Sequence, residues 1–86
     1  MKTIWKFPLN LLVAPVEMPQ GAHILTIQNQ YGVPTIWAEV DDSLPLEEHY
    51  FDVYGTGHKL PEDPGTYIGS VLVDGGRFVL HFYERR

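Results

Sequence analysis

The sequence has no cysteine, no long apolar run and few basic residues. Small secreted domains commonly depend on disulfides, so a cysteine-free chain of 86 residues favours an intracellular setting. No stretch approaches the roughly 18 apolar residues that a membrane-spanning helix needs, and we expect no membrane partner. Lys2 and Lys6 lie where a secretory signal would need its apolar core, which argues against such a signal.

The scarcity of basic residues bears on nucleic-acid binding. The chain carries 6 Lys and Arg against 11 Asp and Glu, for a net charge of -5 at pH 7. DNA and RNA binding depends on clustered Lys and Arg side chains that neutralise phosphates, and here they are scattered. We therefore expect neither DNA nor RNA as a partner. A small anion remains open, because backbone N–H groups can hold a phosphate without net positive charge.

Helical windows are also lacking, since 7 prolines and 8 glycines interrupt the chain at short intervals. The length allows one domain, residues 1–86. Short alternating segments at regular spacing predict an all-β fold, a small antiparallel barrel or sandwich of six to seven short strands. A chain this short has a thin core, yet its hydrophobic content is 44%. We therefore expect a homo-oligomer, in which the apolar surface that the core does not cover is buried between subunits.

The alternation of apolar and polar residues places the strands. In the second full strand we expect Leu25 and Ile27 to point inward, and in the third we expect Trp37 to lie opposite the face of Ile36, Ala38 and Val40. Strands are predicted over 2–7, 23–30, 35–40, 49–56, 66–73 and 77–84, with a weaker extended segment over 11–16. Turns or loops are predicted over 18–21, 31–34, 41–45, 55–65 and 74–76.

The most informative motif is Tyr54-Gly55-Thr56-Gly57-His58, in which two glycines flank a hydroxyl at the end of a strand. Such a turn can direct successive N–H groups at a phosphate or carboxylate, with Thr56 as a further donor. The alternative is a β-bulge or a simple bend into the next loop. The motif is neither a dinucleotide fingerprint nor a Walker loop, because the third glycine and the GK[ST] run are missing.

Aromatic and charged residues complete the predicted ligand site. Tyr54 or Trp37 would stack on a base, while His58 and Arg77 would supply charge or hydrogen bonds. The alternative is that these aromatic side chains form a subunit interface, where Trp and Tyr are enriched. The predicted ligand-binding residues are Trp37, Tyr54, Gly55, Thr56, Gly57, His58 and Arg77.

Catalytic and metal-binding motifs are weak. The closest histidines in sequence, His49 and His58, are too far apart for a typical zinc pair, so we predict no metal and no cofactor. Neither serine lies in a nucleophile elbow, and adjacent acidic residues fall in predicted loops. The sequence therefore does not predict an enzyme. A phosphodiesterase that uses His58 and His81 is kept as an alternative hypothesis.

Several segments together carry a family resemblance: Trp37-Ala38-Glu39-Val40-Asp41, the Tyr54–His58 motif, the opening Lys2-Thr3-Ile4-Trp5-Lys6, Glu17-Met18-Pro19 with Gly21-Ala22, Tyr67-Ile68-Gly69, and Asp74-Gly75 before His81-Phe82. Over nearly its whole length the chain resembles a family of small bacteriophage and prophage proteins. The resemblance implies an early or accessory phage protein in the host bacterial cytoplasm. It implies no role for individual residues.

By class alone, the chain is also similar to the phage sponge proteins that sequester nucleotide signals of bacterial immunity. The leading hypothesis is accordingly a phage-encoded binding protein for a small nucleotide-like ligand. The alternative is a phage protein that inhibits a host protein by direct contact, with an acidic surface facing a basic partner. That surface would comprise Asp41, Asp42, Glu47, Glu48, Glu62 and Asp63.

Overall fold

A computed structural model describes residues 1–10 and 14–86. The described part is built of short strands and one three-residue 3-10 turn, so the predicted all-β class is confirmed. The strands are β1 (Lys2–Pro8), β2 (Val16–Pro19), β3 (His23–Gln30), β4 (Val33–Asp41), β5 (Leu46–His49), β6 (Phe51–Gly55), β7 (Thr66–Val73) and β8 (Phe78–Glu84); the 3-10 turn, η1, covers Asp74–Gly76.

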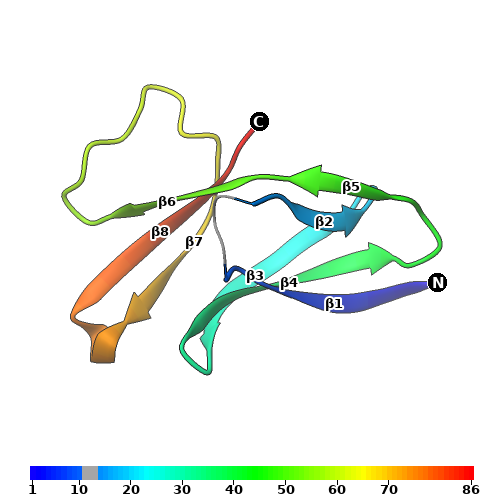
Figure 1. Ribbon diagram of the computed structural model, residues 1–86, viewed down its shortest axis with the longest axis horizontal. Coiled ribbons are helices and arrows are strands. Elements are labelled where there is room, and N and C mark those ends of the chain that lie inside the picture. The colour runs from blue at the N-terminus through cyan, green and yellow to red at the C-terminus, as the bar shows by residue number, and fades with distance from the viewer. Residues whose placement is uncertain (11–13) are drawn as a thin grey trace.

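The strands form three antiparallel sheets (Figure 1). One has the order β1-β4-β3, another the order β6-β8-β7, and the third is the two-stranded ribbon β2-β5. The chain passes almost directly from β5 into β6 at Tyr50, so this stretch pairs with β2 at one end and with β8 at the other (Figure 1). The arrangement is sandwich-like, and the sheets do not close into a barrel within the described residues.

The core lies between the two three-stranded sheets and beneath the ribbon. In β4 the alternation is as predicted, because Ile36, Ala38 and Val40 are buried and Trp37 faces the other way, half-buried. β8 contributes Phe82, which is fully buried. The buried apolar residues are Leu9, Met18, Ile27, Ile36, Ala38, Val40, Phe51, Val71 and Phe82.

A β-bulge in β3 overturns one prediction. Leu25 was expected to point inward with Ile27, but it is 47% exposed. The register with β4 shifts between Ile24 and Thr26, so Leu25 is an extra residue that has no partner in the pairing. A bulge of this kind resets the alternation of side chains. Ile24 and Ile27 therefore face the core in place of Leu25 and Ile27.

Several other element boundaries differ, among them the start of β4 at Val33, within the predicted turn 31–34. The predicted turn over 18–21 is too early, because Met18 and Pro19 are buried in β2 and the turn falls on Gln20 and Gly21. The predicted strand over 49–56 is divided between β5 and β6, and it begins earlier, at Leu46. The extended segment expected over 11–16 has its first three residues outside the described part of the chain.

The predicted hairpins are confirmed. Tyr31 and Gly32 both have positive φ and join β3 to β4, as a two-residue hairpin turn requires. Gly75 and Gly76 likewise have positive φ in η1, between β7 and β8. In β8, Phe82 points into the core while His81 and Tyr83 point out of it, as the alternation predicts.

The two larger sheets approach each other at β3 and β7. A second bulge lies in β7, where Gly69 pairs with Phe82 of β8 and Ile68 is an extra residue without a partner in the pairing. A Cβ atom added at Gly69 would lie 2.8 Å from Cγ2 of Ile27, closer than real Cβ contacts. The absence of a side chain at Gly69 therefore allows β7 to lie this close to the buried Ile27.

Replacement of Gly69 should show how much this contact contributes. An unobstructed Gly→Ala change in a strand stabilises by about 0.5–1 kcal/mol, whereas overpacking costs about 1–3 kcal/mol. We expect Gly69→Ala to lower the free energy of unfolding, and to lower it less in an Ile27→Ala background that lacks Cγ2. Urea denaturation of the four proteins of this cycle measures both quantities. An equal effect of Gly69→Ala in the two backgrounds would contradict the contact.

Candidate functional site

The Tyr54–His58 motif forms a tight turn at the end of β6. The His58 N–H donates to the Gly55 carbonyl oxygen at 3.0 Å, and Gly57 has φ +86°. A positive φ at only the third of four residues is the geometry of a type II turn. At Gly55 an added Cβ would lie 2.9 Å from the His58 ring. One glycine thus makes room for the His58 side chain, and the other takes a backbone conformation that the turn requires.

Two rows of side chains cross the outer face of the β6-β8-β7 sheet, next to this turn. In one row Tyr54, His81 and Ser70 lie opposite one another on the three strands. In the next row Tyr83 lies between Asp52 and Tyr67. Tyr67 and Ser70 would face opposite sides of a regular strand. The bulge at Ile68 brings both to the outer face.

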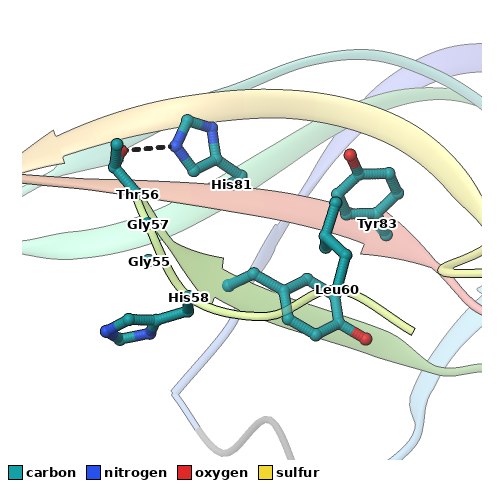
Figure 2. Close-up of a pocket in the computed structure, with 8 residues that line it drawn as sticks. Gly55, Thr56, Gly57, His58, Leu60, His81 and Tyr83 are labelled. Atoms are coloured by element: carbon teal, nitrogen blue, oxygen red, sulfur yellow. Dashed lines mark hydrogen bonds between the residues drawn. The ribbon is translucent and has the colours of Figure 1, made fainter.

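A chain of hydrogen bonds links the turn to β7 through His81. Thr56 Oγ1 lies 2.8 Å from His81 Nε2, and Ser70 Oγ lies 2.7 Å from His81 Nδ1 (Figure 2 shows the first of these). The Tyr67 hydroxyl lies 2.6 Å from Ser70 Oγ. Both ring nitrogens of His81 are therefore engaged, so its ring orientation is held from two strands. Figure 2 shows His58 pointing away from the Thr56–His81 pair.

Tyrosines form the apolar wall of the site. The rings of Tyr54 and Tyr83 meet edge to face, with centroids 5.7 Å apart, and the rings of Tyr67 and Tyr83 meet similarly at 5.4 Å. Leu60 extends from the following loop toward Tyr83 (Figure 2). The turn and this wall enclose a hollow of about 270 Å³, lined by Tyr54, Gly55, Thr56, Gly57, His58, Leu60, His81 and Tyr83.

The seven predicted site residues fall into three groups. The five residues of the motif all line this hollow. Arg77 lies outside it and lines a neighbouring hollow, which shares Gly55, Thr56 and His58. Trp37 lies on β4 in the other large sheet, on the face that does not point into the core, and lines neither hollow. The structure thus brings five of the seven together at one turn, places Arg77 in the neighbouring hollow and leaves Trp37 away from both.

Sequence reasoning missed several residues of the site. The predicted ligand-binding residues do not include His81, Tyr83, Ser70 or Tyr67. The alternation in β8 was a usable pattern, because it predicts that His81 and Tyr83 share a face. Ser70 and Tyr67 join that face only through the bulge in β7, which no local pattern indicates.

An ion pair lies at the far end of the same face. The Arg85 guanidinium donates two hydrogen bonds to Asp52, at 2.8 and 3.1 Å, and these bonds hold the pKa of that carboxyl below its ordinary value. Arg85 also lies over the Tyr50 ring, 5.3 Å from its centroid. Asp52 is therefore already neutralised within the chain. Within residues 1–10 and 14–86, no three His, Asp or Glu side chains come together as a metal site would need.

The conformation of the turn can be tested at Gly57. An L-residue held in left-handed backbone geometry costs about 1–2 kcal/mol, and Asn tolerates this geometry better than Ala. We expect Gly57→Ala to reduce the free energy of unfolding by about this amount, and Gly57→Asn to reduce it less. Tryptophan fluorescence during urea denaturation gives the values. Equal stability of all three proteins would show that the turn does not need the positive φ.

Comparison with known proteins gives a family and no described activity. No curated protein and no solved structure matches the chain. The part of the chain that the structure describes has no helix with the length and apolar character to cross a membrane. One family model, described as a domain of unknown function (DUF7352), matches residues 1–86. Because this match spans the entire sequence, the chain belongs to the DUF7352 family.

Proposed function

We propose that this domain binds a small nucleotide-like ligand at the Gly55–His58 turn and sequesters it without cleaving it. The observation that carries the proposal is the combination found in one hollow of about 270 Å³. The Thr56 hydroxyl and the His58 ring lie at its turn, the His81 ring on β8 contacts Thr56, and tyrosine rings form its wall. Ligand sites are typically concave and largely apolar, with a few polar groups that fix orientation.

The phosphate would lie on the turn. Within the described residues, the Gly57 N–H donates no hydrogen bond, so it is available to an anion. The Thr56 hydroxyl is held by His81 and can still donate to or accept from a ligand, because a hydroxyl has one hydrogen and two lone pairs. The His58 ring lies against Gly55 and adds a further donor.

The base would lie against the tyrosines. Stacking on an aromatic side chain contributes about 1–3 kcal/mol per base and tolerates different bases. Tyr83 is held between Tyr54 and Tyr67 by edge-to-face contacts, so its ring loses little freedom when a ligand binds. These contacts favour Tyr54 and Tyr83, rather than Trp37, as the residues that recognise a base.

The biological setting of the proposal comes from the resemblance to phage proteins. A phage protein that holds a nucleotide signal of host immunity would lower the free concentration of that signal in the host cytoplasm. Tight binding without turnover is sufficient for this role. A homo-oligomer would raise the number of sites per particle.

Inhibition of a host protein by direct contact is supported less well. Of the acidic residues on which it depends, several are already engaged within the chain. Glu47 lies 3.2 Å from His49, and Asp63 lies 3.2 Å from Arg86. The ammonium group of Met1 lies 3.1 Å from Asp41 and 3.0 Å from Asp42. These contacts leave less unpaired negative charge for a basic partner than the composition suggests.

Cleavage of the same ligand is the second candidate, and the contacts of His81 favour it. A hydroxyl on one ring nitrogen and an orienting group on the other are the parts of a nucleophile–base pair. In such a reaction Thr56 Oγ1 would attack the phosphorus of a diester while His81 Nε2 takes its proton. The alcohol that leaves would then receive that proton from His81.

Binding can be tested with a thermal-shift panel of AMP, cyclic dinucleotides, cyclic ADP-ribose and NAD. A ligand at a hundred times its dissociation constant adds about 2.7 kcal/mol, which raises Tm by on the order of ten degrees in a domain of this size. We expect Thr56→Val and His58→Ala to remove the shift. His23→Ala is the matched control, because His23 is exposed and lines neither hollow. No shift with any compound would contradict the proposed function.

Sequestration and cleavage make opposite predictions for the fate of a bound ligand. We expect chromatography to recover the ligand unchanged after prolonged incubation with excess protein, because the role needs binding alone. If products form instead, and if His81→Gln stops their formation, the second candidate replaces the first. Mass spectrometry of the protein would then be used to look for a nucleotide joined to Thr56 through a phosphodiester, which is what loss of one alcohol from the diester leaves on the threonine.

A further inference from the structure

A second hollow, of about 530 Å³, adjoins the first at the edge of the sheet where β8 extends two residues past the end of its partner β6. β6 stops at Gly55, opposite Leu80, so Phe78 and Val79 pair only with β7. The two hollows share Gly55, Thr56 and His58. The first is walled by the outward-facing Tyr54, His81 and Tyr83, and the second by Val73, Phe78 and Leu80, which share the side of the sheet that faces the core. The turn therefore separates two recesses on opposite faces of one sheet.

The second hollow offers a site for another flat ring. Phe78 is 55% exposed, whereas on the same face of β8 Leu80 is half-buried and Phe82 is fully buried. The guanidinium of Arg77 lies over the Phe78 ring, 5.8 Å from its centroid, and pairs with Asp74 at 3.6 Å. An exposed aromatic ring beside an arginine can stack with a base and attract a phosphate.

The sizes of the two hollows bear on the ligand. Small-molecule sites typically have volumes of about 300–1,000 Å³. The hollow on the outer face, at about 270 Å³, falls just below this range, whereas its neighbour, at about 530 Å³, lies within it. Thr56 and His58 line both hollows. A ligand confined to the outer hollow would contact these two residues, but it would contact neither Arg77 nor Phe78.

We propose that the ligand is of the dinucleotide type, with two bases joined through phosphate. One base lies against Tyr54 and Tyr83, the linking phosphate crosses the turn at Thr56 and His58, and the second base lies against Phe78. This inference rests on the proposed nucleotide-binding function and specifies its ligand class. A mononucleotide fills one recess and leaves the other to water.

Isothermal titration with matched probes tests the inference. AMP has one base and a phosphate monoester, whereas the linear dinucleotide ApA has two bases and a single diester. ApA carries less negative charge, so tighter binding of ApA reports the second base rather than electrostatic attraction. We expect ApA or cyclic di-AMP to bind at least tenfold more tightly than AMP. Equal or weaker binding of both dinucleotides would overturn the inference while leaving nucleotide binding intact.

Variants then place the second base. Phe78→Ala and Arg77→Ala change exposed side chains, and we expect each to weaken the tighter dinucleotide at least tenfold more than AMP. Arg86→Ala is the matched control, because Arg86 is also exposed and ion-paired but lines neither hollow. An unchanged preference for the dinucleotide in both variants would overturn the assignment of this hollow. Failure of AMP and both dinucleotides to bind would instead count against the proposed function itself.

Discussion

β8 hydrogen-bonds to β6 on one side and to β7 on the other, and the alternation of its side chains connects the core to the candidate site. Phe82 is fully buried between the sheets, while its neighbours His81 and Tyr83 form part of the outer hollow. A strand cannot turn one of these faces without turning the other, because successive side chains point to opposite sides. The burial of Phe82 therefore fixes the direction in which His81 and Tyr83 point.

The β-bulges add what regular pairing cannot supply. In β7 the bulge brings Tyr67 and Ser70 to one face and leaves Gly69 facing β3. The same irregularity thus completes the hydrogen-bond chain to His81 and allows the close approach of the two sheets. Bulges occur often near functional sites, where they redirect a side chain. Here the redirected side chain is Ser70, which holds His81 at Nδ1.

Local patterns were sufficient for most of the fold. Turn residues such as Tyr31-Gly32 and Asp74-Gly75-Gly76 mark hairpins because their positive φ values depend on few neighbours. The outward position of Leu25 could not be predicted from alternation, since the bulge that causes it depends on the register with β4. For the site, the motif from Tyr54 to His58 could be recognised in the sequence because its five residues are contiguous. The positions of Ser70 and Tyr67 beside His81, and of Trp37 away from the hollow, could not be predicted from the sequence, because strand order and the bulge decide which distant residues meet.

The bulge in β7 has a consequence for how the family can vary. Removal of one residue between Tyr67 and Ser70 would leave them two positions apart, and a regular strand with that spacing still places both side chains on the outer face, opposite Tyr83 and His81. At the spacing found here, three positions apart, only the bulge keeps both on that face. The contacts of His81 therefore depend on spacing and bulge together, because a bulged strand of this length and a regular strand one residue shorter present the same side chains.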